Sequence, residues 1–234
     1  MNITDLFTSL SYGELSNLAM GTDGTGVIRT SDQPRVLNAA NEALLLLHSK
    51  FVLSSKDIWI ESRKHITYYH FDTRFAESNA ATSNEDYLYI KDLVGDPFIG
   101  DVIKVLSVFD DKEYELPLND SEHPYSVFTP QPRMLQIPDP TEGALFNVVY
   151  QAKHPLLVLE TPTQEIDLPD VLHAALRGYV AYRMYSSINT QEATVKAAEH
   201  LGNYEGICQN ATDFDLVNTS IATTNVRFQK NGWV

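Results

Sequence analysis

The sequence predicts an α+β fold: a bundle of N- and C-terminal helices, an inserted antiparallel β domain and an extended C-terminal tail. Helical periodicity appears in residues 31–51 and again from about residue 168. Between them lie only short runs rich in Ile, Val, Tyr and Phe, which favour an antiparallel sheet or small sandwich over βαβ units. We therefore expect an N-terminal helical part, a β insertion, C-terminal helices packing with the N-terminal part, and a tail, over residues 1–55, 56–165, 166–215 and 216–234.

The first long helix is expected in residues 31–51, where apolar residues recur at three- and four-residue spacing, namely Val36, Ala40, Leu44, Leu47 and Phe51. Asp32 is the expected N-cap, and Pro34 falls in the first turn, where its missing N–H does no harm. In residues 10–26 we expect a short helix or helices closed by a loop containing Gly21, Gly24 and Gly26.

The β insertion is expected to contain six strands, in the runs IWIES, HITYYHF, YLYIKDLV, DVIKVLSVF, EYELPL and ALFNVVYQA. The segments between them carry most of the Pro, Asn and Ser, and eight of the eleven prolines fall between Pro97 and Pro155. We therefore interpret the separating segments as loops, including residues 129–143.

Two further helices are expected after the insertion. Residues 167–188 place Leu172, Leu176, Tyr179 and Arg183 along one face, with Asp167 as the cap and Pro169 in the first turn. Their small residues Ala174, Gly178 and Ala181 share a face, which favours close packing of a neighbouring backbone. Residues 189–214 begin with Asn189 and Glu192 in capping-box spacing and continue with an apolar stripe of Ala193, Ala197, Leu201, Tyr204, Ile207 and Ala211.

Charge and composition exclude several classes of protein. The net charge of −14 argues against tight binding of nucleic acid, although an acidic wall could let DNA pass without holding it. A single cysteine, Cys208, allows no intramolecular disulfide and no cysteine-based zinc cluster, which fits a reducing cytoplasm. No segment reaches 18 apolar residues and the N-terminus does not resemble a signal peptide, so we expect a soluble protein made in the cytoplasm, without a membrane partner.

The sequence offers no recognisable catalytic, cofactor or metal motif. His65 and His70 are five residues apart in a predicted strand, so they point to opposite faces. The loop GTDGTG lacks the order of a phosphate-binding fingerprint, and Cys208 has no histidine at a suggestive spacing. A pair of catalytic carboxylates cannot be recognised from one sequence and stays possible. We nevertheless expect a protein that is not an enzyme and that uses no cofactor.

The C-terminal tail differs from the rest of the chain in charge. All 31 acidic residues lie in residues 1–215 with 15 of the 17 basic ones, so the body carries −16 and the tail +2. A β-branched stretch in residues 216–228 suits strand addition to another protein, where Arg227 could pair with acids and Trp233 could anchor in a pocket. Extended, the tail would span roughly 60 Å. The alternative is a frayed or self-folded terminus.

Five stretches together resemble a head-to-tail connector, or adaptor, of short-tailed bacteriophages, closest to the N4-like podoviruses: residues 6–28, 35–51, 59–71, 168–207 and 226–234. The resemblance implies a structural virion protein that forms a ring, typically a dodecamer, below the portal protein. Its tail would dock onto the portal, its lower surface would receive the tail tube or nozzle, and DNA would pass through the central channel. On this basis we assign portal contacts to Val226, Arg227, Phe228 and Trp233.

Two alternatives remain open from the sequence. The protein could be another phage structural protein, such as a tail-tube or fibre-docking protein. It could also be a module whose β domain binds a glycan or host factor through a tyrosine platform, formed by Tyr68, Tyr69, Tyr87 and Tyr89. Adjacent tyrosines in a strand point to opposite faces, so at most half of each pair could serve one surface.

Overall fold

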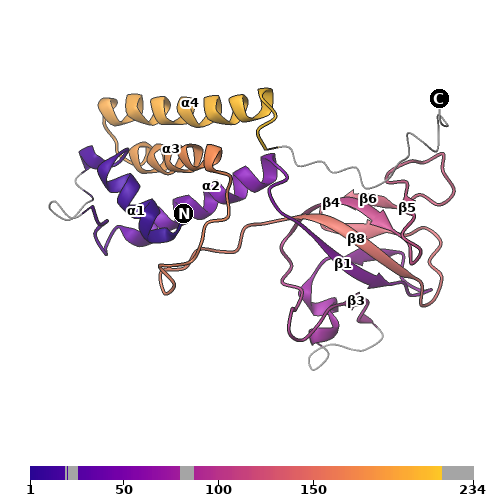
Figure 1. The fold of residues 1–234 in the computed structure, drawn as a ribbon. Helices are drawn as coiled ribbons and strands as arrows, with labels where there is room; N and C mark the ends of the chain where they lie inside the picture. The colour runs from indigo at the N-terminus through magenta and orange to yellow at the C-terminus, as the bar shows by residue number, and fades with distance from the viewer. Residues whose placement is uncertain (19, 21–25, 80–86, 218–234) are drawn as a thin grey trace, which may run out of the picture.

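The computed structural model describes residues 1–18, 20, 26–79 and 87–217. Helices gather at one end of the molecule and strands at the other (Figure 1). We call these two parts the helical module and the β module. The predicted α+β class, with helices from both ends of the chain around an antiparallel β insertion, is confirmed. The helices are α1 (Ile3–Tyr12), α2 (Gln33–Lys50), α3 (Asp170–Ser186) and α4 (Gln191–Asp213).

The first helix lies earlier than the sequence analysis placed it. Asn2 caps α1 by accepting a hydrogen bond from the Asp5 backbone N–H at 2.8 Å, and the Asp5 carboxylate accepts from the Asn2 N–H at 3.0 Å. This reciprocal capping box fixes the start of the helix, which ends before Gly13. Of the expected glycine-rich loop, Gly21 and Gly24 lie outside the described residues.

Two of the three predicted helix caps are wrong. Asp167 does not cap α3, because Pro169 occupies the N-cap position and its extended backbone precedes the first helical residue. Asn189 does not cap α4 either, because its neighbour Thr190 takes that position and accepts from the Ala193 N–H at 3.2 Å. Asp32 does stand at the N-cap of α2, with Pro34 in the first turn, but its side chain makes no capping hydrogen bond within the described residues.

The helical core forms from the apolar faces that periodicity predicted. α3 packs along α4, and α2 packs against α3 (Figure 1). From the predicted stripes, Val36, Ala40, Leu44, Leu47, Leu172, Leu176 and Tyr204 are all buried in one cluster. Cys208 belongs to the same cluster and is fully buried, which makes it a core residue of α4.

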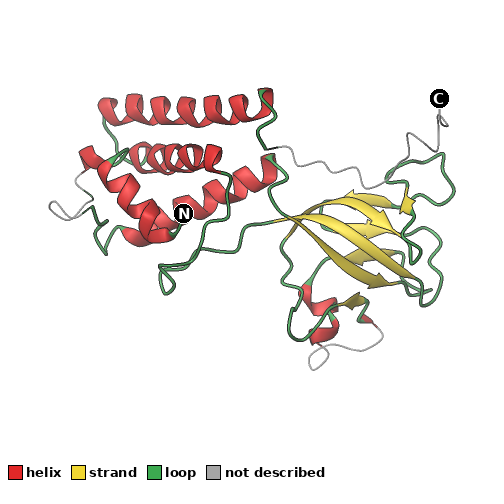
Figure 2. Cartoon of the chain, in the orientation of Figure 1, coloured by secondary structure: helices red, strands yellow, loops and turns green. Residues whose placement is uncertain are grey.

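The β module is a small antiparallel sandwich (Figure 2). The larger sheet has the order β3-β1-β8-β4-β5 and the smaller one β2-β7-β6, and both contribute to a second hydrophobic cluster. Within both sheets, all the strand pairs in the described residues are antiparallel. The strands are β1 (Ser55–Glu61), β2 (Tyr68–His70), β3 (Ile90–Lys91), β4 (Val102–Phe109), β5 (Glu115–Leu116), β6 (Phe128–Gln131), β7 (Met134–Gln136) and β8 (Leu145–Ala152).

The interpretation of residues 129–143 as a loop is wrong, because β7 and most of β6 lie there. Pro130 falls inside β6, which is an edge strand, and an edge is where a sheet tolerates a residue without an N–H. The runs HITYYHF and YLYIKDLV do contain strands, but these are only three and two residues long.

Candidate assembly surfaces

The joint between the two modules is held by side-chain to backbone hydrogen bonds. Gln151, near the end of β8, is almost fully buried, and its side-chain amide donates to the carbonyl oxygens of Phe51, at 2.8 Å, and of His48. These carbonyls lie at the C-terminal end of α2, where the helix itself supplies no partner. The Nδ1 atom of His48 also lies 3.3 Å from the carbonyl oxygen of Ala152. The end of α2 is thereby tied to the central strand β8.

A second tie holds the chain that returns from the sheet to the helices. The Asn41 side chain donates to the carbonyl oxygen of Leu157 at 3.1 Å and accepts from the Leu157 N–H at 2.9 Å. Leu157 is buried in the helical cluster. Neither Asn41 nor Gln151 was singled out from the sequence. A glutamine within the apolar run ALFNVVYQA was the available signal, since a buried amide requires partners.

The α3–α4 hairpin is packed closely at Gly178. A Cβ atom at this position would lie 3.4 Å from the backbone oxygen of His200 and 3.7 Å from the backbone nitrogen of Tyr204. Ala181 is fully buried on the same face, and Ala174 is half-buried beside a hollow of about 420 Å³ between the two helices. At Gly178, therefore, the backbones of α3 and α4 approach each other closely within one chain.

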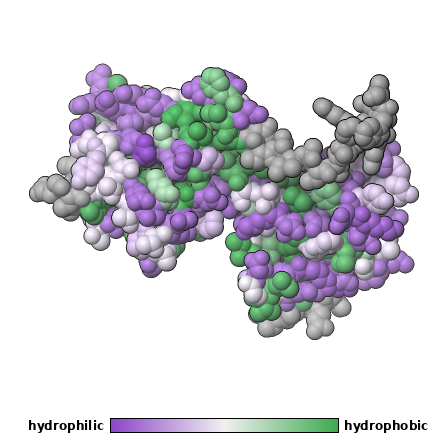
Figure 3. All heavy atoms as spheres, in the orientation of Figure 1, coloured by the Kyte–Doolittle hydropathy of each residue, from purple (hydrophilic) through white to green (hydrophobic). Residues whose placement is uncertain are grey.

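A groove of about 530 Å³ lies where the helical module meets the β module. Its helical wall includes Phe51, Val52 and Ala211, and its sheet wall includes Leu106 of β4 and Val149 of β8. In Figure 3, hydrophobic surface is concentrated over the end of the helical module that faces the β module. The groove is a recess at the joint with apolar side chains on both walls.

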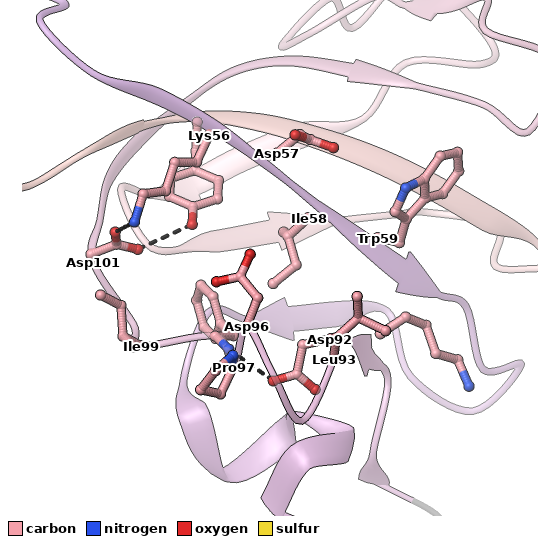
Figure 4. Close-up of a pocket in the computed structure, with 13 residues that line it drawn as sticks. Lys56, Asp57, Ile58, Trp59, Asp92, Leu93, Asp96, Pro97, Ile99 and Asp101 are labelled. Carbon is pink, nitrogen blue, oxygen red and sulfur yellow. Dashed lines mark hydrogen bonds and ion pairs between the residues drawn. The ribbon is translucent and has the colours of Figure 1, made fainter.

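The β module carries a smaller pocket of about 210 Å³ between β1 and the loop that follows β3 (Figure 4). The exposed side chains of Leu93 and Ile99 and the indole of Trp59 lie around it, together with the carboxylates of Asp57 and Asp96. Lys56 and Lys91 also line the pocket, and each is paired with a carboxylate, Lys56 with Asp101 and Lys91 with Glu61. The pocket would therefore suit a partner that presents basic and apolar side chains.

Asp92 holds the loop beside this pocket in shape. Its carboxylate accepts hydrogen bonds from the Ser78 N–H at 2.8 Å, from the Ser78 hydroxyl at 2.6 Å and from the Phe98 N–H at 2.8 Å. Burial raises the pKa of Asp92, but the hydrogen bonds from Ser78 and Phe98 outweigh it and leave the pKa below its ordinary value. The loop that carries the exposed side chains of Leu93 and Ile99 is thus held in shape by the hydrogen bonds of Asp92.

The four tyrosines considered as a platform are divided between core and surface. Tyr69 and Tyr89 are buried, with ring centroids 5.0 Å apart. The hydroxyl of Tyr69 accepts from the Arg63 N–H at 2.9 Å, and that of Tyr89 accepts from the His70 N–H at 2.8 Å. Tyr68 and Tyr87 are about half exposed, so only these two can meet a ligand.

Within the described ranges, no group of three or more His, Cys, Asp or Glu side chains is placed to hold a metal ion. His65 contacts Tyr87 and His70 stacks on Phe75, so the two histidines face different neighbours. Burial raises the pKa of the Cys208 thiol, which disfavours a reactive thiolate. None of the described helices is long and apolar enough to cross a membrane. The predicted portal contacts Val226, Arg227, Phe228 and Trp233 lie outside the described residues.

Comparison with known proteins identifies the family of this chain. No curated protein matches the chain. The model of one protein family, described as SU10 adaptor protein, matches residues 11–224, which include α2, the whole β insertion, α3 and α4. The chain therefore belongs to the SU10 adaptor protein family, and it is a structural adaptor protein of a bacteriophage virion.

Proposed function

We propose that this adaptor forms a ring between the portal and the tail of the virion, with its C-terminal segment docked onto the portal and DNA passing through the central channel. The observation that carries the proposal is the contrast in charge between a body of −16 and an acid-free end of +2. An acidic ring would repel DNA and so would not bind it tightly in the channel. A C-terminal segment that has basic and aromatic residues but no acidic ones suits binding to a protein partner. The N4-like type, the dodecamer and synthesis in the host cytoplasm stay predictions.

Exposed apolar residues of the helical module support the ring. α2 contains four consecutive leucines, of which Leu44 and Leu47 are buried and Leu45 and Leu46 are exposed. In the turn formed by these four leucines the helix is apolar on all sides, and a neighbouring subunit would cover the side that the chain itself leaves exposed. Val195 is 62% exposed on α4 and would be covered in the same way.

The docking segment is assigned to residues 225–234, with Val226, Phe228 and Trp233 as apolar anchors and Arg227 paired with acids of the portal. The β module would then face the tail tube or nozzle, with the pocket at Trp59 and Leu93 as one contact.

Deletion of residues 225–234 tests this assignment. We expect the shortened chain to lose binding to the portal ring of the same phage while its urea-unfolding midpoint stays unchanged. A control with Lys64→Ala, an exposed residue of the β module, should bind as the full chain does. Full portal affinity after the deletion would exclude the docking role of this segment.

A further inference from the structure

We propose that residues 218–224, which follow α4 and Val217, lie in the groove between the helical and β modules and fix the point from which the docking segment leaves the subunit. The inference concerns the free chain, and it stands whether or not residues 225–234 bind the portal. The proposed occupant of the groove is thus residues 218–224 of the same molecule.

The turn after α4 aims the chain at the groove. Asp215 has a φ of +54°, in the left-handed region, which Asp adopts more readily than most residues. The Leu216 N–H donates to the carbonyl oxygen of Ala211 at 3.0 Å, and the Asp215 N–H donates to that of Thr212 at 3.1 Å. These two bonds form a Schellman motif, which stops the helix and fixes the direction of the next residues.

Val217 is the first residue to follow that direction. It packs against the helical core and is one of the residues that line the groove. The described chain thus ends inside the recess that we assign to the next residues. Val52 of the helical wall is 42% exposed, and Leu216, next to Val217, is 52% exposed, so both have apolar surface left to cover.

The composition of residues 218–224 fits this position. They read NTSIATT and carry no charge, so they can enter an apolar recess without burying an ion. Ile221 is their one large apolar residue. It follows Val217 by four positions, a reach of roughly 13 Å in an extended chain, so it can fill the groove against Leu106 and Val149. The Thr, Ser and Asn side chains can hydrogen-bond the polar groups at the rim.

The groove has one wall in each module, so a segment that lies in it would contact both the helical module and the β module. It would add to the ties that Gln151 and Asn41 already make at the joint. It would also give residues 225–234 a fixed starting point, which raises the effective concentration of the docking segment at one place on its partner.

Disulfide trapping in the full-length free chain tests the proposal. The double variant Val149→Cys with Ile221→Cys places thiols on the sheet wall and on the proposed anchor, while native Cys208 is buried. The matched control is Leu145→Cys with Ile221→Cys, which uses the same strand β8 four residues from Val149. We expect the first pair to form an intramolecular disulfide about ten times faster than the control, because a seated segment has a high local concentration.

Equal rates for the two pairs would overturn the proposal. A disulfide that joins two molecules would overturn it as well, because the groove would then hold a second copy. Hydrogen exchange gives an independent readout without cysteines. The amides of residues 218–224 should be protected in the full chain and lose protection in Val149→Lys, with the far-ultraviolet circular dichroism spectrum checking that this variant folds. If the amides of residues 218–224 exchange at the unprotected rate in both proteins, the proposed position of this segment in the groove is wrong.

Discussion

The side-chain amide of Gln151 donates a hydrogen bond to the backbone carbonyl of Phe51 over 2.8 Å, and so connects the central strand β8 to the end of α2. The two residues are 100 positions apart in the chain. The bond satisfies a helix-terminal carbonyl with a side chain from the other module. The relative placement of the helical and β modules therefore depends on a small number of buried polar contacts at the joint.

Replacing Gln151 with Leu should destabilise the protein by about 1–3 kcal/mol, because the buried carbonyls of Phe51 and His48 would lose their partner. Urea unfolding followed by fluorescence gives the change in the free energy of unfolding. The matched control is Gln209→Ala on the exposed face of α4, which should change stability by less than about 0.5 kcal/mol. Equal effects of the two substitutions would show that Gln151 does not hold the joint.

Replacing Gly178 with Leu should destabilise the protein by about 1–3 kcal/mol, because a Cβ atom there would already touch the backbone of α4 at His200 and Tyr204. The same change at Gly202 is the control, since a Cβ atom there meets nothing within 4 Å. Gly202→Leu should stabilise the free chain by up to about 1 kcal/mol through helix propensity. Thermal unfolding of both variants checks the contrast, and a harmless Gly178→Leu would contradict the packing of α3 on α4.

Lowering the pH should weaken the joint. Burial lowers the pKa of His48, with the neighbouring His154 as the next cause, and burial also lowers the pKa of His154. Because the folded state then binds fewer protons than the unfolded state, stability is fully present above the ordinary histidine pKa of about 6.5 and falls as the pH drops through the depressed folded-state pKa values.

Urea unfolding at about pH 7.5 and about pH 5.5, on either side of the ordinary histidine pKa, measures this dependence. The variant His48→Gln should show a smaller loss of stability between the two values than the parent chain. His173 and His200 have lowered pKa values too, so some dependence should persist in the variant. If His48→Gln loses as much stability as the parent chain between the two pH values, the pH dependence of stability arises from groups outside the joint.

The sequence predicted the long helices and the class of the β insertion, and it missed features that depend on tertiary structure. The stripe containing Val36 and Leu44 identified α2 because its periodicity extends over many residues. The cap of α4 was placed one residue early because Asn189 and Thr190 are both good capping residues. Pro130 concealed β6, since a proline argues against a strand unless that strand is known to be an edge.

The candidate surfaces were less predictable than the fold. Gly178 was recognised because glycine is rare inside helices, so its presence already indicated a close approach. The roles of Gln151 and Asn41 depend on partners about 100 residues away or more, which no local pattern identifies. The groove at Val149 exists only once the two modules are joined.

Mass photometry of the purified chain, alone and mixed with the portal ring of the same phage, tests the central claim most directly. The account predicts one discrete complex whose added mass equals a full ring of adaptor copies, twelve if the resemblance holds in this respect. A chain whose mass is unchanged by the portal would contradict the proposed adaptor ring and the docking role of its acid-free C-terminal segment.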